Sequence, residues 1–175
     1  MQLEVTLNTA LLVIDMQRSL LDEDPWNSSA VLHRVGCLIT LARSKGAPIA
    51  FIKDRRVGPD QRLHTSLVPV EAEGVIDKSF CDAFLNTPLE TWLNERGIRR
   101  LSVVGMQTDY CIDTTCKRAA SLGFAVELVK DAHTTFDHEF LTAEQIVNHH
   151  NRVLHGFQAG EGSIRAIDSS EVRFV

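Results

Sequence analysis

Short apolar runs alternate along the chain with longer stretches in which apolar residues recur every three or four positions. The first short run, residues 10–15, is apolar until it ends in Asp15, which is typical of a parallel strand covered on both faces. The alternation predicts βαβ units and therefore an α/β fold, a three-layer α/β/α sandwich around a mostly parallel sheet. We expect six strands in this sheet, at residues 10–15, 48–53, 75–76, 100–105, 124–129 and 163–167.

Helix boundaries are predicted from the capping residues and glycines that flank the helical stretches. Residues 31–42 carry one apolar stripe at helical spacing. The polar stretch 54–70 contains glycine and proline and is predicted to be a long loop. The first predicted helix is capped by Ser28 or Ser29 and ends at Gly46, and the second begins at a capping box in residues 87–90 and ends at Gly97. The third begins near Cys111, after a turn at residues 106–110, and ends at Gly123. The fourth begins at a capping box in residues 142–145 and runs towards His155.

Length and composition indicate a single domain over residues 1–175. A chain of 175 residues with 44% hydrophobic residues buries a sufficient core without metal or crosslinks. Its formal net charge is -5 and its pI is near 5.8. Because a surface that binds a polyanion needs clustered Lys and Arg, and the basic residues here are dispersed, we expect no nucleic-acid partner.

The sequence also bears on the compartment of the protein. Residues Met1 to Asn8 lack a basic segment followed by a long apolar stretch, and no apolar run approaches the ~20 residues that cross a bilayer. We therefore expect a cytoplasmic protein without a membrane partner. Reduced thiols are expected, with neither a zinc site nor a disulfide framework, because no Cys-x-x-Cys pair occurs among Cys37, Cys81, Cys111 and Cys116.

Three reactive side chains are predicted to meet at one edge of the sheet, although they are remote in sequence. Asp15 closes the first predicted strand, Lys78 follows the third, and Cys111 follows the fourth at a helix start. In an open parallel sheet the carboxyl ends of the strands form the ligand-binding crevice. A helix N-terminus and a nearby ammonium favour the thiolate form of a cysteine, and Asp15 is placed to accept its proton.

Each of these residues alone has an ordinary structural interpretation. A helical cysteine is commonly a small buried apolar residue, an aspartate after a strand is commonly a turn or cap residue, and a lysine is commonly solvated. The combination is more specific. The segments 11–17 (LLVIDMQ), 78–84 (KSFCDAF) and 105–112 (GMQTDYCI) together resemble the isochorismatase-like cysteine hydrolase superfamily over nearly the whole chain. That superfamily includes nicotinamidases, N-carbamoylsarcosine amidase, ureidoacrylate amidohydrolases and streptothricin hydrolase.

The resemblance implies an isochorismatase-like, Rossmann-like fold and an amidase mechanism. Cys111, Asp15 and Lys78 form the implied triad, which cleaves a C–N bond of a small-molecule substrate through a Cys111 thioester. The peptide bond between Met106 and Gln107 is implied to be cis, and the N–H groups of Gln107 and Cys111 are implied to form the oxyanion hole. No cofactor is implied, and relatives of this kind form homo-oligomers.

A substrate pocket and the absence of a metal complete the expected site. Gln17, Trp26, Phe80 and Tyr110 flank the three motifs and are candidates for the pocket wall, whereas core packing is an equally good account of the nearby Phe84. Nicotinamidases commonly hold a metal through an Asp-x-His pair after strand two. This chain has Asp54-Arg55-Arg56 there, so we expect no metal, and we interpret His64 as a solvated loop residue.

Neither the remaining histidines nor any nucleotide-binding motif indicates another function. Residues 131–133 and 137–139 are predicted to lie in a loop after the fifth strand, and His149, His150 and His155 lack the glutamate of a zincin motif. The absence of a Gly-x-Gly-x-x-Gly or P-loop motif argues against nucleotide binding. Two alternatives stay open: a non-catalytic or redox-sensing thiol protein on the same fold, and an isochorismatase-type vinyl-ether hydrolase, whose members generally lack the cysteine.

Overall fold

The computed structural model describes residues 8–174. The expectation about the segment Met1 to Asn8 therefore lies, apart from Asn8, outside the described residues. The strands are β1 (Thr9–Ile14), β2 (Ile49–Asp54), β3 (Gly74–Lys78), β4 (Arg100–Met106), β5 (Ala125–Thr134), β6 (Gln158–Ala159) and β7 (Gly162–Ile167). The helices are α1 (Arg18–Leu21), α2 (Ser28–Ser44), α3 (Leu89–Glu95), the π-helical turn η1 (Thr108–Ile112), α4 (Asp113–Ser121), α5 (Ala143–Leu154) and the 3-10 turn η2 (Ser169–Glu171).

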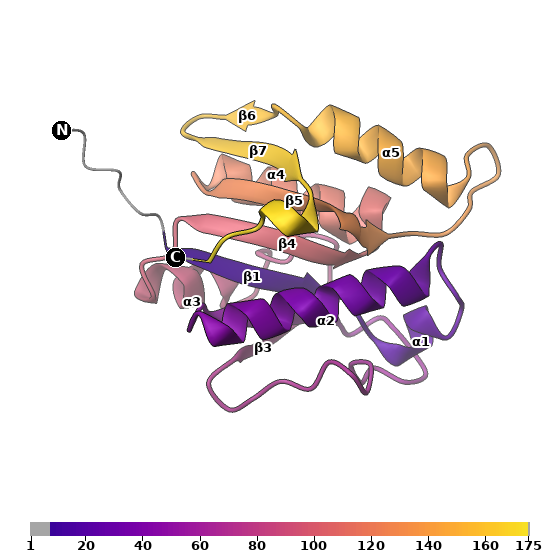
Figure 1. Cartoon of the computed structure of the whole chain (residues 1–175), viewed down its shortest axis with the longest axis horizontal. Helices are drawn as coiled ribbons and strands as arrows, with labels where there is room; N and C mark the ends of the chain where they lie inside the picture. The colour runs from indigo at the N-terminus through magenta and orange to yellow at the C-terminus, as the bar shows by residue number, and fades with distance from the viewer. Residues whose placement is uncertain (1–7, 175) are drawn as a thin grey trace.

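In the described part of the chain one sheet holds seven strands, in the order β3-β2-β1-β4-β5-β7-β6 (Figure 1). All neighbouring strands are parallel except the edge pair β6 and β7, which is antiparallel. The mostly parallel α/β sheet is thus confirmed, and the expected number of six strands is wrong. The missed strand, Gln158–Ala159, is two residues long, so it shows no apolar period in the sequence.

Alternate residues of the central strands are buried in two different apolar clusters. Leu12 and Ile14 of β1 join a cluster with residues of α3 and α4, whereas Leu11 and Val13 join a cluster with residues of α2. All six residues of β1 are buried, which agrees with the near-continuous apolar run in the sequence. Because helices cover both faces of the central strands, the edge formed by the strand ends is the part of the sheet that remains open to a ligand.

Several predicted boundaries differ from the structure. Helix α2 follows Asn27, which has a left-handed conformation (φ 54°) and no side-chain cap; neither Ser28 nor Ser29 caps the helix, and the Ser28 hydroxyl donates to Asp24 instead (2.8 Å). The capping box predicted for α3 is not formed: the N-cap is Pro88, and the Thr87 hydroxyl donates to the carbonyl of Ala83 (2.6 Å) and accepts from the N–H of Leu89 (3.3 Å). The second predicted box is present: Thr142 caps α5 together with Gln145.

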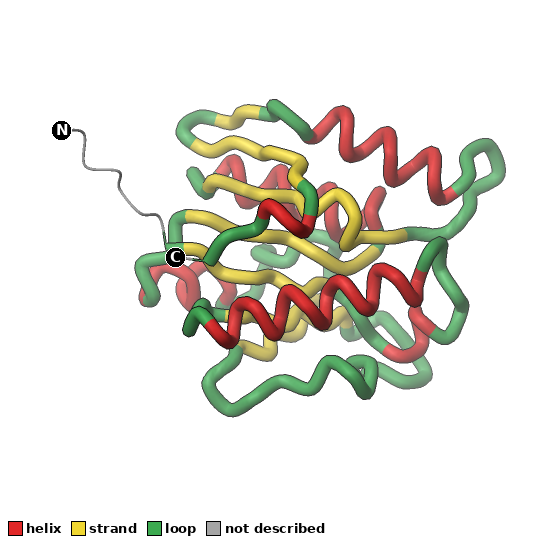
Figure 2. The backbone as a smooth tube through the Cα atoms, viewed as in Figure 1, coloured by secondary structure: helices red, strands yellow, loops and turns green. Residues whose placement is uncertain are grey.

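Two differences concern the segments nearest to the candidate site. Cys111 lies within the π-helical turn η1, where a turn followed by an α-helix start was expected. Strand β5 continues to Thr134, so residues 131–133 belong to the strand and not to a loop as predicted. The predicted loop after β2 is present, and Figure 2 shows that residues 55–73 cross the edge of the sheet without strand or helix.

Gly105 allows β4 to end directly beside β1. Its φ is 118°, and a Cβ at this position would lie 2.0 Å from the carbonyl oxygen of Ile14. Gly105 pairs with Ile14 in the parallel register of the two strands. A glycine is therefore required here for close backbone approach. This contact sets the end of β4, and hence the start of η1, next to the end of β1.

Candidate active site

The polar residues of the candidate site lie at the carboxyl ends of four neighbouring strands. Asp15 directly follows β1, Asp54 is the last residue of β2, Lys78 is the last residue of β3, and Cys111 lies in η1 after β4. Asp54 and Lys78 are partners in the parallel register of their strands. Asp15 has φ 52°, a left-handed conformation that aspartate tolerates better than most residues and that turns the chain out of the sheet.

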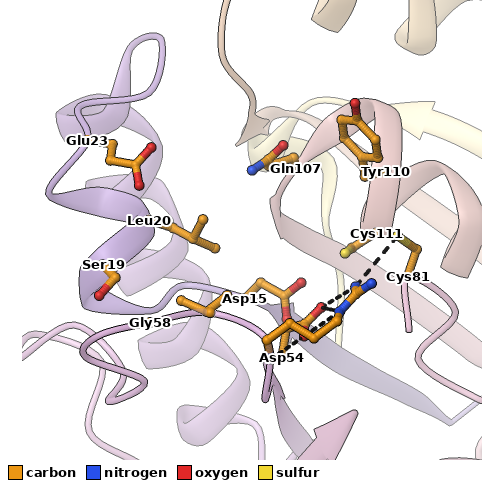
Figure 3. A pocket seen from close by; sticks show the side chains of 12 residues that line it. Asp15, Ser19, Leu20, Glu23, Asp54, Gly58, Cys81, Gln107, Tyr110 and Cys111 are labelled. Atoms are coloured by element: carbon orange, nitrogen blue, oxygen red, sulfur yellow. Dashed lines mark hydrogen bonds and ion pairs between the residues drawn. The ribbon is translucent and has the colours of Figure 1, made fainter. Parts of the chain in front are cut away.

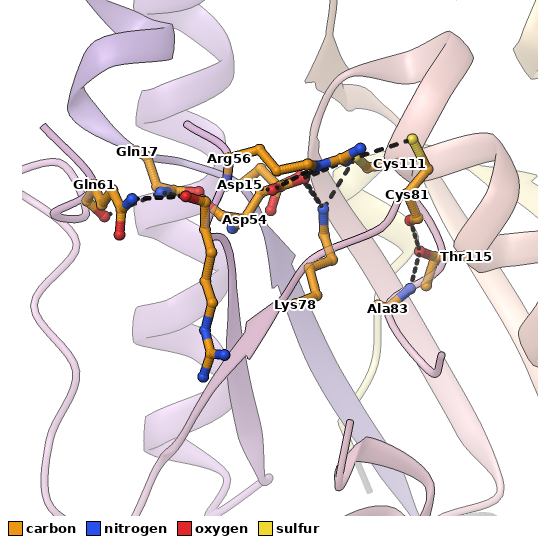
Figure 4. A network of polar contacts seen from close by, with 11 residues as sticks. Asp15, Gln17, Asp54, Arg56, Gln61, Lys78, Cys81, Ala83, Cys111 and Thr115 are labelled. Carbon is orange, nitrogen blue, oxygen red and sulfur yellow. Dashed lines mark hydrogen bonds and ion pairs between the residues drawn. The ribbon is translucent and has the colours of Figure 1, made fainter. Parts of the chain in front are cut away.

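Lys78 is the centre of the contacts in this group (Figure 4). Its Nζ lies 2.8 Å from Asp15 Oδ2, 2.8 Å from Asp54 Oδ2 and 3.2 Å from Cys111 Sγ. The residue is only 1% exposed. A buried ammonium requires charged partners, and the two carboxylates satisfy that requirement. The structure thus brings the three predicted catalytic residues together, and it adds Asp54, which the sequence analysis had considered only as a metal ligand.

Asp15 is a buried carboxylate with one oxygen free to accept a proton. Burial raises its pKa to about 6, while the positive charge and hydrogen bond of Lys78 limit this rise. Within the described residues Oδ1 of Asp15 is buried and has no hydrogen-bond partner. Ligand atoms of Asp15, Asp54 and Cys111 all lie within 4.8 Å of one another. An unpartnered buried oxygen beside a thiol suits an acceptor of the thiol proton.

Burial opposes the ionisation of Cys111. Burial raises the pKa of the thiol above its ordinary value, and the charge of Asp15 adds to this rise; Lys78 opposes both effects. Burial therefore opposes the thiolate bias expected from a helix start, and that bias stays a prediction. Cys111 lies in a π-helical turn and the residue is only 7% exposed, so its thiol has lost most of its hydration. A nucleophilic role consequently requires a base that removes the proton during attack.

Asp54 links the buried lysine to the surface. Its carboxylate accepts a bidentate pair of hydrogen bonds from Arg56, with Nε–Oδ1 at 3.0 Å and Nη2–Oδ2 at 2.6 Å. These bonds and those from Lys78 hold the pKa of Asp54 well below its usual range, although burial acts in the opposite direction. The sequence signal for this residue is its position as a carboxylate that ends a buried strand, the same signal that identified Asp15.

The arrangement also bears on metal binding. In the part of the chain that the structure describes, Asp15, Asp54 and Cys111 are the group whose ligand atoms lie close enough to share an ion. Their atoms already surround the Lys78 ammonium, so a cation at the centre would have to displace it. His64 lines other hollows of the surface and bonds Ser66 through Nδ1 (2.8 Å). The absence of a metal remains a prediction.

A cavity of about 430 Å³ opens over Asp15 and Cys111 (Figure 3). This volume is within the range of roughly 300–1,000 Å³ in which proteins hold small-molecule ligands. Of the residues predicted for the pocket and the oxyanion hole, Gln107, Tyr110 and Cys111 line the cavity. The complete lining consists of Asp15, Ser19, Leu20, Glu23, Asp54, Arg56, Val57, Gly58, Cys81, Gln107, Tyr110 and Cys111.

The remaining pocket candidates lie elsewhere. Gln17 is fully buried, and its amide bonds the backbone N–H and carbonyl of Asp54 (2.7 and 3.1 Å), so it joins two strand ends and does not line the cavity. Trp26 is half-buried, and its backbone N–H donates to Thr135 (3.0 Å). Phe80 is 46% exposed. Neither Trp26 nor Phe80 is among the residues that line the cavity.

The turn that carries Cys111 is fixed by a buried hydrogen-bond chain that the sequence analysis missed. Asn151 donates to the carbonyl of Lys130 (3.1 Å), so its Oδ1 accepts from Nε2 of His133 (2.9 Å). The Nδ1 of His133 then accepts from the Thr108 hydroxyl at the start of η1 (2.8 Å). Burial lowers the pKa of His133 to about 4, which keeps the ring neutral and this chain intact.

The backbone before this turn has the implied geometry. The peptide bond between Met106 and Gln107 is cis. Gln107 follows β4 in an extended conformation and directly precedes η1. Its side chain and the sulfur of Cys111 both line the cavity, and Figure 3 shows them on the same side of it.

Comparisons with known proteins identify the family. The family model described as the isochorismatase domain matches residues 9–154. An uncharacterized isochorismatase family protein, YddQ of Bacillus subtilis, is 32% identical over 142 residues, which cover 74% of this chain and 79% of that protein. A streptothricin hydrolase of Streptomyces noursei is 32% identical over 73% of this chain, and the match spans 50% of that protein.

Two further matches extend this picture. Nicotinamidase 3 of Arabidopsis thaliana is 27% identical over 74% of this chain and 75% of its own. The crystal structure of an isochorismatase family protein superposes with a TM-score of 0.83 and 29% identity, covering 92% of this chain and 98% of that one. No helix in residues 8–174 is long and apolar enough to cross a membrane. The chain belongs to the isochorismatase family of hydrolases, some of which act on amide C–N bonds.

Proposed function

We propose that this protein hydrolyses an amide-type C–N bond of a small molecule through a thioester on Cys111. The proposal rests on one observation: the buried ammonium of Lys78 contacts both the proposed base, Asp15, and the proposed nucleophile, Cys111. Lys78 Nζ lies 2.8 Å from Asp15 and 3.2 Å from the sulfur of Cys111, at the base of a cavity large enough for a small substrate. Relatives that act on amides add support from the family.

The first half of the proposed reaction forms the acyl-enzyme. Asp15 Oδ1 takes the proton of Cys111 while the sulfur attacks the substrate carbonyl carbon. Lys78 keeps Asp15 ionised before the attack, because its charge lowers the pKa that burial has raised. The N–H groups of Gln107 and Cys111 stabilise the oxyanion of the tetrahedral intermediate; preorganised donors of this kind contribute about 3–4 kcal/mol.

The second half releases both products. Asp15 delivers the thiol proton to the departing amine nitrogen, and the C–N bond breaks to leave a thioester on Cys111. A water molecule then attacks the thioester, with Asp15 as the proton acceptor, and the carboxylic acid leaves as the thiol is restored. The reaction is balanced by one water and uses the same carboxylate in both directions of proton transfer.

The test is a comparison of cysteine variants on a substrate panel. Small primary amides, N-carbamoyl compounds and lactams are assayed for release of ammonia or amine. For any substrate that is hydrolysed, Cys111→Ala is expected to lower kcat/KM by about 10³-fold or more. Cys81→Ala is the matched control, because this cysteine lines the same cavity outside the triad. Undiminished turnover by Cys111→Ala, with the variant folded, would refute the proposal.

A further inference from the structure

Glu23 brings an unpaired negative charge to the mouth of the cavity. It follows α1 and lines the cavity together with Leu20 and Ser19 of that helix. Among the described residues Glu23 has no hydrogen-bond or ion-pair partner, and it is exposed. In Figure 3 its carboxylate lies across the cavity from Gln107 and Tyr110. The structure therefore leaves one charged group of the lining without a partner of its own.

The positive charges near the cavity are already neutralised. Arg56 is the one basic residue of the lining, and its Nε and Nη2 donate three hydrogen bonds to Asp54. Lys78 lies beneath the lining, with Asp15 and Asp54 as its counter-ions. Arg55 is not in the lining and lies 3.6 Å from Asp77 instead. Among the described residues, each cation at this cavity thus already has a carboxylate counter-ion.

The wall opposite Glu23 offers groups that suit a cation. Tyr110 is 48% exposed and lines the cavity, so its ring is accessible to a ligand. The face of an aromatic ring attracts a cation within about 6 Å, worth roughly 0.5–1 kcal/mol at an exposed site. Gln107 adds an amide oxygen on the same side (Figure 3). The carboxylate of Glu23 suits an ammonium or guanidinium group, and the Tyr110 ring lies on the opposite side of the cavity (Figure 3).

We propose that the substrate is a cationic amide, whose ammonium or guanidinium group is bound by Glu23 while its carbonyl lies at Cys111. The identity of the reacting bond rests on the proposed function. The preference for a positively charged ligand does not rest on the proposed function, because it depends only on the residues that line the cavity. The two parts can therefore be tested separately.

The preference for charge is measured with thiol reagents that enter the cavity. Methanethiosulfonates with a trimethylammonium-ethyl, a hydroxyethyl or a sulfonatoethyl group are used. Each transfers its thioalkyl group to the sulfur of Cys111 as a mixed disulfide and releases methanesulfinate. The rate at Cys111 is followed by mass spectrometry of its peptide, separately from that at Cys81, and is divided by the rate with glutathione.

Variants then assign the preference to Glu23. The wild type is expected to react faster with the cationic reagent than with the neutral one, and Glu23→Gln is expected to lower this ratio about fivefold. Asp22→Asn removes the same charge one residue earlier, outside the cavity lining, and is expected to leave the ratio within twofold. High salt should also reduce the ratio, since an exposed ionic contact is screened. Tyr110→Leu should reduce it less than Glu23→Gln does.

Substrates provide the second readout. The cationic amide δ-aminovaleramide should have a higher kcat/KM than its neutral isostere hexanamide, and Glu23→Gln should remove that difference. A preference for the sulfonate reagent, or a cation preference unchanged in Glu23→Gln, would overturn the inference about charge. Amidase activity that survives Cys111→Ala would overturn the proposed function instead and leave the reagent ratios as an independent result.

Discussion

The raised pKa of Asp15 predicts how activity depends on pH. Asp15 is buried, and burial raises its pKa to about 6. In the proposed mechanism the ionised carboxylate is the form that accepts the thiol proton. An acid whose pKa is raised reaches its active, ionised form only above that pKa. We therefore expect kcat/KM to be complete above about pH 7 and to be lost as the pH falls through about 6.

The size of the loss follows from the ionised fraction. With a pKa of about 6, roughly one tenth of Asp15 is ionised at about pH 5, so kcat/KM should fall about tenfold between about pH 7 and pH 5. A carboxylate with the ordinary value of 3.8 would remain more than about 90% ionised at the same pH. The values of kcat/KM expected at about pH 5 in the two cases differ by roughly an order of magnitude, which is well above the error of a rate measurement.

The cause of the shift is tested with Asp54. The negative charge of Asp54 contributes to the raised pKa of Asp15, so Asp54→Asn is expected to move the acid limb of kcat/KM to lower pH. Asp77→Asn is the control, because Asp77 pairs with Lys53 at 3.2 Å outside the site. Circular dichroism at each pH verifies that the protein stays folded. A limb that stays in place in Asp54→Asn would refute the contribution of Asp54 to the shift, and a flat profile to about pH 4 would refute the assignment of Asp15 as the base.

Three further predictions concern the supports of the site. Gly105→Ala should unfold or severely destabilise the protein, since its Cβ would lie 2.0 Å from the carbonyl oxygen of Ile14; a midpoint of denaturation within error of wild type would contradict this. Thr108→Val should lower stability by about 1–3 kcal/mol and also lower kcat, because Nδ1 of buried His133 loses its donor; rates unchanged at equal stability would argue against a positioning role. Thr142→Ala should cost about 1 kcal/mol in denaturant titrations with kcat unaffected, because it removes only the cap of α5.

The sequence predicts the arrangement of the strands better than their ends. Buried strands such as residues 9–14 can be recognised from their apolar composition, and a parallel topology then places their carboxyl ends together. Asp15, Lys78 and Cys111 could be grouped for that reason. Strand β5 was predicted too short because its end contains Asp131 and His133, whose polar side chains find partners that only the tertiary structure supplies.

The pocket was the least predictable part. The sequence shows that Gln17 is close to Asp15 but not that its amide turns inward to the backbone of Asp54. Polarity alone did not distinguish Glu23 from its neighbours, because a lining residue is defined by the direction of a side chain in a turn. Burial likewise opposes the expected ionisation of Cys111, since the cost of desolvating a thiolate is set by atoms from several elements.

The central claim is that Asp15 and Cys111 act together in one chemical step, and a double-mutant cycle tests it most directly. The measurement is kcat/KM of Asp15→Asn, Cys111→Ala and the double variant on one hydrolysed amide. If the two groups form one unit, each single variant loses about 10³-fold or more and the double variant loses no more than the worse single one. Losses that multiply in the double variant, or a Cys111→Ala rate close to that of the wild type, would contradict the account.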